Sequence, residues 1–141
     1  MNNKSSVFLF TKDRPEVFRQ TLENLMPIIH RIFIVDDSCH YSNRSENEKI
    51  ALTNGCVYLG EKSFQNFMIA HKIVPDICSF LLSPPGTVEW NLGYMRNFAL
   101  LYAKALKLET VLFMDDDITV RDKHLIDKLL GLTSRKYGLV P

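Results

Sequence analysis

Three consecutive aspartates, Asp115, Asp116 and Asp117, directly follow the apolar run Thr-Val-Leu-Phe-Met at positions 110–114. Such a run predicts a buried strand of a parallel sheet, and open α/β sheets place ligands at the carboxyl ends of their strands. Three neighbouring carboxylates repel one another there unless a cation, or a ligand that carries one, neutralises them. The alternative interpretation is a solvated acidic turn that caps a helix starting near Asp122. We prefer the metal or ligand site because another predicted strand also ends in acids.

Polar side chains end two further predicted strands. Residues 32–35 run into Asp36 and Asp37, and residues 7–10 run into Thr11. If the strands are parallel, all of these ends meet at one edge of the sheet, which then holds five carboxylates. Mg²⁺ and Mn²⁺ prefer oxygen ligands, and they usually take one or two carboxylates from the protein and the rest from phosphates and water. The pattern therefore predicts that a diphosphate binds here through a divalent cation, which neutralises a departing phosphate.

The segments between the strands must place these side chains, and most of these segments are predicted to be helices. Asp13 is an N-cap candidate for a helix that has Pro15 in its first turn and that stops at Pro27. Its predicted apolar face consists of Phe18, Leu22, Leu25 and Met26. The remaining predicted elements are a loop at 38–44, a helix at 45–54 closed by Gly55, a weak strand at 56–59, an uncertain helix at 61–73, a break at 83–86, helices at 91–107 and 122–130, and the start of a strand at 137–141. Alternating strands and helices predict an α/β fold with a mostly parallel sheet flanked by helices.

Bulk composition narrows the class of protein. The 141 residues suffice for one domain, so we treat 1–141 as a unit, and the strand start at the end leads us to expect that the domain is incomplete at its C-terminus. A net charge of +1 gives no indication of nucleic-acid binding. No apolar run reaches the length of a transmembrane helix, and the polar N-terminus is unlike a signal peptide. We expect a cytoplasmic protein whose three cysteines are reduced thiols.

Four segments, taken in order, resemble those of a known family. They are Thr-Lys-Asp-Arg-Pro at 11–15, Val-Asp-Asp-Ser at 35–38, Asn-Leu-Gly-Tyr-Met-Arg-Asn at 91–97 and Phe-Met-Asp-Asp-Asp at 113–117. The sequence resembles the Rossmann-like, nucleotide-binding half of a GT-A fold glycosyltransferase of the large family 2 type, from Val7 to about Val120. The segments correspond to that family's Thr-x-Asn-Arg-Pro, Val-Asp-Asp-Gly-Ser, Asn-x-Gly…Arg-Asn and Asp-x-Asp patterns.

The resemblance implies an activity and its participants. It implies an inverting transfer of a sugar from a nucleotide-sugar donor, which we expect to be UDP-linked, to a glycan, lipid or protein acceptor, with Mn²⁺ or Mg²⁺ as cofactor. It also allows peripheral association with a membrane. The residues implied to bind the nucleotide are Thr11, Arg14, Asp36, Asp37, Arg96, Asp115 and the variable middle residue Asp116. The implied metal ligands are Asp117 and Asp115.

The sequence departs from the family in several places. Asp13 replaces an asparagine, Ser38-Cys39 replaces Gly-Ser, and the stretch 61–89 has no assigned role. The family's general base, which deprotonates the acceptor hydroxyl, follows well after the Asp-x-Asp and is therefore expected beyond Pro141. We accordingly expect weak or no transfer activity from these residues alone.

Three other functions remain open from the sequence. A non-catalytic nucleotide-sugar binding module needs no general base. A phosphoacceptor receiver domain has a similar length, but its acidic pair follows the first strand, whereas here the first predicted strand ends at Thr11. A metal-dependent nucleotidyltransferase usually has a glycine- and basic-rich loop after that strand, which the residues Lys-Asp-Arg at 12–14 do not provide.

Overall fold

A computed structural model describes residues 5–72, 92–122, 124–126 and 128–129. Within these residues four strands form one parallel sheet: β1 (Ser5–Thr11), β2 (Ile32–Asp36), β3 (Val57–Leu59) and β4 (Thr110–Asp115). The strands lie in the order β3-β2-β1-β4, and every neighbouring pair is parallel. The predicted α/β architecture with a parallel sheet is confirmed.

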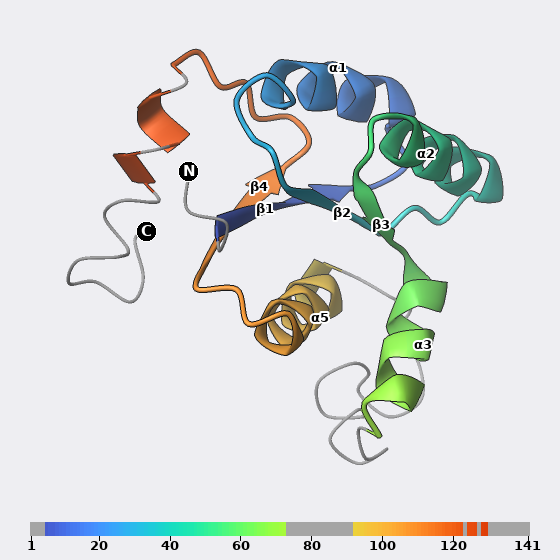
Figure 1. Ribbon diagram of the computed structural model, residues 1–141. Helices are drawn as coiled ribbons and strands as arrows, with labels where there is room; N and C mark the ends of the chain where they lie inside the picture. Colours follow the sequence, from blue (N-terminus) through green and yellow to red (C-terminus); the bar gives the residue numbers. More distant parts are fainter. Residues whose placement is uncertain (1–4, 73–91, 123, 127, 130–141) are drawn as a thin grey trace.

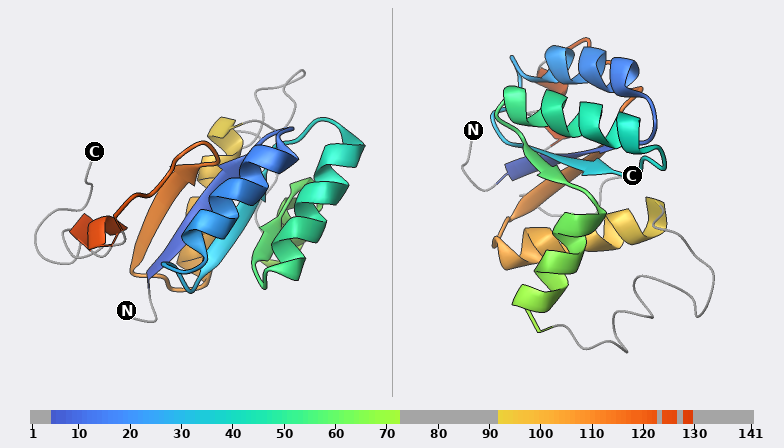
Figure 2. Two further views of the ribbon diagram at one scale, coloured as in Figure 1. Left: turned by 90° about the horizontal axis from the view of Figure 1, so that it is seen from above. Right: turned by 90° about the vertical axis from the view of Figure 1, so that its right-hand side faces the viewer.

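Helices cover both faces of this sheet. The helices α1 (Pro15–Leu25) and α2 (Tyr41–Thr53) lie side by side over one face, and α3 (Glu61–Ala70) and α5 (Leu92–Ala105) lie below the other (Figures 1 and 2). Residues 124–126 and 128–129 are also helical. The result is a three-layer, Rossmann-like arrangement in which helices separate successive strands.

The strand order reverses at β1. From β1 the chain steps outward through β2 to β3, and it then returns on the other side of β1 to form β4. Phe10 of β1 pairs with Asp115 of β4, and Thr11 pairs with Asp36 of β2, so the carboxyl ends of these three strands meet. In open α/β sheets the helices diverge at such a reversal and leave a crevice in which ligands bind.

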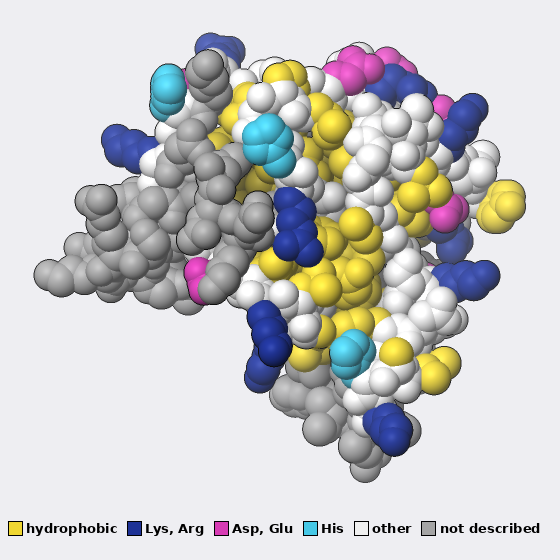
Figure 3. All heavy atoms as spheres, viewed as in Figure 1, with side chains coloured by type: hydrophobic (Ala, Val, Ile, Leu, Met, Phe, Trp, Pro, Cys, Tyr) yellow, Lys and Arg dark blue, Asp and Glu magenta, His cyan; other side chains and the backbone are white. Residues whose placement is uncertain are grey.

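Strict alternation along the strands divides the core into two halves. Val7 and Leu9 pack with the apolar residues of α1 and α2, whereas Phe8 and Phe10 pack with those of α3 and α5. The second half is rich in aromatic rings: Phe8 stacks on Phe33 with ring centroids 4.8 Å apart. Figure 3 shows hydrophobic side chains gathered in the middle of one face of the molecule, with Lys and Arg side chains beside them.

Several predicted boundaries are wrong. Helix α2 begins at Tyr41, inside the predicted loop 38–44, and Asp13 from another segment accepts hydrogen bonds from the N–H groups of Cys39 and His40 just before it. Asp13 is not the N-cap of α1: Arg14 occupies that position without a side-chain cap hydrogen bond, and Asp13 has a left-handed φ of 50°. Strand β4 is only partly buried because it lies at an edge of the described sheet.

The other predicted elements compare as follows. The face of α1 is confirmed for Phe18, Leu22 and Leu25, which are buried, and Met26 is the C-cap. The uncertain helix at 61–73 is α3, which is three residues shorter, and Gly55 closes α2 with a φ of 69°. Helix α5 ends at Ala105, before the left-handed Lys107. The predicted break at 83–86 and the strand start at 137–141 lie outside the described residues.

The aromatic half of the core predicts a large effect of truncating Phe8. We expect Phe8→Ala to lower the free energy of unfolding by about 3–5 kcal/mol, because the ring is fully buried and its loss leaves a cavity. Urea unfolding followed by circular dichroism measures this change. The control Leu52→Ala, at a 60% exposed position on α2, should change stability by less than about 0.5 kcal/mol. Equal effects of the two substitutions would contradict this description of the core.

Candidate functional site

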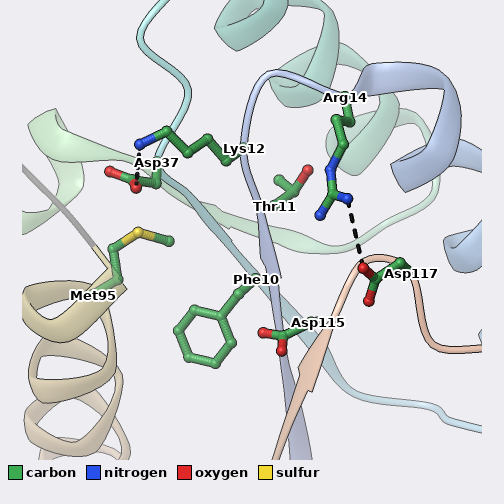
Figure 4. A pocket seen from close by; sticks show the side chains of 8 residues that line it. All are labelled: Phe10, Thr11, Lys12, Arg14, Asp37, Met95, Asp115 and Asp117. Atoms are coloured by element: carbon green, nitrogen blue, oxygen red, sulfur yellow. Dashed lines mark hydrogen bonds and ion pairs between the residues drawn. The ribbon is translucent and has the colours of Figure 1, made fainter.

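A pocket of about 280 Å³ opens at the carboxyl ends of β1, β2 and β4, where the strand order reverses (Figure 4). Strand β1 and the loop after it provide one part of its wall, β2 and β4 provide acidic side chains, and α5 provides a methionine. The lining residues are Phe10, Thr11, Lys12, Arg14, Asp37, Met95, Asp115 and Asp117. The acidic edge predicted from the sequence therefore lines a concave site, and the turn at residues 116–117 forms part of it.

The middle aspartate of the triplet, Asp116, lies inside the protein. Its side chain is fully buried and accepts hydrogen bonds from Thr11 Oγ1, at 2.7 Å, and from the guanidinium of Arg14. Its backbone carbonyl accepts a further bond from Thr21 Oγ1 of α1, at 2.5 Å. Asp116 thus joins the end of β4 to β1 and α1 and does not line the pocket.

Among the effects on the pKa of Asp116, burial is the largest. Burial raises the pKa of this carboxyl above its ordinary value, and the negative charges of Asp117 and Asp115 add to that effect. The hydrogen bond from Thr11 and the positive charge of Arg14 act in the opposite direction. A cation at the mouth of the pocket would therefore relieve a repulsion that the fold itself imposes.

The two outer aspartates are exposed at the pocket. The side chains of Asp115 and Asp117 are 51% and 57% exposed. Asp115 Oδ1 lies 3.6 Å from Arg96 Nη2, and Asp117 Oδ2 lies 3.5 Å from Arg14 Nη1. The guanidinium of Arg96 also lies 5.8 Å from the ring centroid of Phe10. Because these pairs are half exposed to water, each contributes little to stability and is readily exchanged for a ligand.

Asp36 and Asp37, adjacent in sequence, have different environments. Asp36 accepts hydrogen bonds from the amide N–H of Ser38 (2.8 Å), from Asn47 Nδ2 (3.2 Å) and from the hydroxyl of Tyr58 (2.7 Å). These bonds hold it beneath the loop that follows β2, so it does not line the pocket. The pocket instead receives its neighbour Asp37.

Asp37 combines deep burial with an unused acceptor. Its side chain is 5% exposed, and its Oδ2 accepts a hydrogen bond from Lys12 Nζ at 3.0 Å. Its Oδ1 is buried without a hydrogen-bond partner among the described residues. Burial raises the pKa of Asp37, opposed by Lys12 and reinforced by Asp36 and Asp13. A buried acceptor of this kind is costly unless a donor reaches it, and a ligand N–H or O–H would provide one.

The described residues could hold a divalent cation only with help from a ligand. No group of three or more His, Cys, Asp or Glu side chains in the described part of the chain is arranged to hold a metal ion. Asp115 and Asp117 offer carboxylates at the pocket. One or two protein carboxylates, completed by phosphate oxygens and water, are the usual ligands of Mg²⁺ in nucleotide sites. The donor set therefore fits a metal that enters with a phosphate ligand, and it does not fit a closed protein-only site.

The structure brings most of the predicted site residues together. Thr11, Arg14, Asp37, Asp115 and Asp117 line the pocket, Arg96 lies beside it through Asp115, and Asp36 and Asp116 lie behind its wall.

Three lining residues were not predicted from the sequence: Phe10, Lys12 and Met95. Lys12 could have been found, because it lies inside the segment 11–15 that carries the resemblance. Met95 is buried in the core as well as lining the pocket, and no sequence pattern shows that one methionine does both.

The raised pKa of Asp37 predicts a particular dependence of stability on pH. Between the ordinary value of 3.8 and the raised pKa, the folded protein binds more protons at this site than the unfolded chain. Wild-type protein should therefore lose stability relative to Asp37→Asn as pH rises through that window, and the difference should level off above it. Urea unfolding of both proteins from about pH 4 to about pH 8 measures this. A wild type that gains stability relative to the variant as pH rises would contradict the assignment.

No protein-family model matches this sequence, and no curated protein matches it significantly. Among the described helices, none has the length and apolar character needed to cross a membrane. The residues of the pocket therefore carry the functional conclusion.

Proposed function

We propose that the pocket binds the diphosphate of a nucleotide-sugar donor through Mn²⁺ or Mg²⁺, and that the protein is an inverting glycosyltransferase. One observation carries this proposal. At the strand-order reversal, two exposed carboxylates, Asp115 and Asp117, face a pocket that also receives the cations Lys12 and Arg14. A metal–diphosphate unit needs both signs of charge, acids for the metal and bases for the phosphate oxygens.

Each charged residue then has a part in binding. Asp117, with Asp115, would hold the cation, which when bound neutralises charge on the leaving diphosphate. Arg96, which lies 3.6 Å from Asp115, would turn to the phosphate oxygens. Arg14 would offer them its Nη1, which lies 3.5 Å from Asp117, while its Nη2 stays on Asp116. The pocket would thus exchange internal ion pairs for pairs with the ligand.

The nucleoside would lie toward β2. Asp37 Oδ1 is a buried acceptor without a described partner, and a uracil N–H or a ribose hydroxyl would satisfy it. Phe10 and Met95 give this part of the pocket apolar surface on which a planar base can pack. These features support UDP as the nucleotide portion. They concern the donor side of the reaction, and none of the pocket residues is assigned as the general base.

Strand order separates this proposal from a receiver domain. The described strands follow the order 3-2-1-4, which is the beginning of the dinucleotide-binding order, whereas receiver domains use the flavodoxin-like order 2-1-3-4-5. The first strand also ends at Thr11 and not in an acidic pair. A non-catalytic nucleotide-sugar binding module would use the same pocket. Sugar transfer would exclude such a module, whereas weak or absent transfer by residues 1–141 is expected of both.

The proposal predicts manganese-dependent binding of UDP. Calorimetric titration of UDP and GDP, each with and without Mn²⁺, should show UDP binding that requires the metal. Asp117→Asn should weaken this binding at least tenfold, about 1.4 kcal/mol, because it removes a metal ligand. The matched control Asp122→Asn changes an exposed aspartate outside the lining of the pocket and should leave affinity unchanged. Absence of binding by every nucleotide–metal combination would refute the donor site.

Arg96 provides a test with effects of opposite sign. Removing its charge in Arg96→Gln should make Mn²⁺ alone bind about 2–5 times more tightly, since Asp115 loses its internal partner. The same change should weaken binding of UDP with Mn²⁺, since a phosphate contact is lost. Lys104→Gln, at an exposed position on the same helix, is the control. Effects of the same sign in both titrations would contradict the exchange of partners.

A further inference from the structure

Asp13 connects the two loops that border the pocket. It lies in the loop between β1 and α1, and its carboxylate accepts hydrogen bonds from the loop between β2 and α2 and from the first turn of α2. The donors are the backbone N–H of Cys39 to Oδ2, at 3.0 Å, and, to Oδ1, the backbone N–H of His40 at 3.0 Å and Nδ2 of Asn43 at 3.1 Å. In the other direction, the backbone N–H of Asp13 donates to Ser38 Oγ at 2.8 Å. Asp13 thus makes three hydrogen bonds to this loop and, through its carboxylate and its carbonyl, two more to Asn43 in the first turn of α2.

These donors surround the start of α2. The helix begins at Tyr41, and its N-cap residue His40 makes no side-chain cap hydrogen bond. Amide groups at a helix start need acceptors and favour a negative charge, and Asp13 supplies both from a distant segment. Burial acts against ionisation of Asp13, but the backbone N–H groups of His40 and Cys39 and the side chain of Asn43 outweigh it, so its pKa is lowered. Asp13 is therefore ionised at neutral pH.

The backbone of Asp13 determines where its neighbours point. Its φ of 50° is left-handed, a conformation that Asp and Asn tolerate better than most residues. The chain turns sharply there, and the side chains on either side diverge: Lys12 extends to Asp37 and Arg14 extends to Asp117 (Figure 4). Both cations of the pocket thus flank the residue that ties the loops together.

We propose that Asp13 is a positioning residue of the ligand site, which holds Lys12 and Arg14 on opposite sides of the pocket without contacting the ligand. This inference rests on the proposed function, because the two cations are taken to meet a diphosphate. Without the carboxylate, the loop between β1 and α1 would lose its connection to α2 and sample several conformations. Phosphate binding would then have to order both cations, and affinity would fall.

Two substitutions distinguish the effect of the Asp13 carboxylate from the effect of its left-handed backbone. Asp13→Gly keeps the left-handed backbone at no steric cost but removes all side-chain acceptors. Asp13→Asn keeps the conformation and one acceptor oxygen, but it replaces the other oxygen with a donor that cannot serve the N–H of Cys39 or His40. The control Glu16→Gln neutralises an exposed acid on α1 outside the pocket lining. A second control, Ile50→Val, weakens the buried side of α2 and shows what simple destabilisation does.

Two measurements on the full 141-residue chain test the proposal. Calorimetric titration of UDP with Mn²⁺ should show affinity at least tenfold lower in Asp13→Gly, an intermediate value in Asp13→Asn, and unchanged values in both controls. Hydrogen exchange should show faster exchange of the amides of Cys39 and His40 in Asp13→Gly, with unchanged exchange in the strands. The partial rescue by asparagine distinguishes positioning from loss of stability, which Ile50→Val also suffers.

The outcomes separate this inference from the proposed function. If wild-type protein binds UDP with Mn²⁺ and Asp13→Gly binds equally well, the positioning role is wrong and the donor site stands. If Ile50→Val loses as much affinity as Asp13→Gly, the effect is one of stability and the positioning role is again wrong. If wild-type protein binds no nucleotide with any metal, the proposed function fails and the inference falls with it.

Discussion

The fully buried carboxylate of Asp116 is the contact on which the pocket depends. Burying a charged group is costly, and here the cost is offset by the hydrogen bond from Thr11, the charge of Arg14 and the bond from Thr21 to the carbonyl of the same residue. Strand β4 ends at Asp115 and the chain turns at Asp116 and Asp117, so the buried side chain of Asp116 lies between two acids that remain exposed. The interior contact thereby anchors the turn that carries Asp117.

The charged side chains in and beside the pocket are likewise paired with one another. The two cations of the pocket and Arg96 beside it all lie within ion-pairing distance of an acid: Lys12 of Asp37, Arg14 of Asp116 and Asp117, and Arg96 of Asp115. A phosphate alone would be repelled by the acids, and a metal ion alone would be repelled by the cations. A ligand of either sign is therefore opposed, whereas a ligand that brings both signs together can replace each internal partner with an external one. If the proposed ligand binds here, its metal and phosphate would bind in a coupled way without any change in the fold.

Sequence reasoning was most successful where a strand meets its polar end. The apolar runs that end at Thr11, Asp36 and Asp115 predicted the parallel sheet and the edge at which the acids gather. The prediction from sequence failed where a residue contacts a segment that is distant in the sequence. Asp13 was assigned to its own helix because N-caps are usually local, but it serves the start of α2 instead. Likewise, no pattern in the sequence shows that Asp116 is buried while the acids on either side of it are exposed, because burial depends on β1 and α1.

The bond between Thr11 and Asp116 joins residues 105 positions apart. Closing so long a loop is entropically costly, and parallel pairing of distant strands is intrinsically slow. Strands β1, β2 and β3 and the helices between them can assemble from contacts nearer in sequence, but the pocket lacks Asp115 and Asp117 until β4 docks beside β1. A partly folded chain would present Arg14 without Asp117, while Lys12 would keep its partner Asp37. If the pocket binds the proposed ligand, binding would begin only when β4 is in place, and its appearance during refolding would report the pairing of β4 with β1.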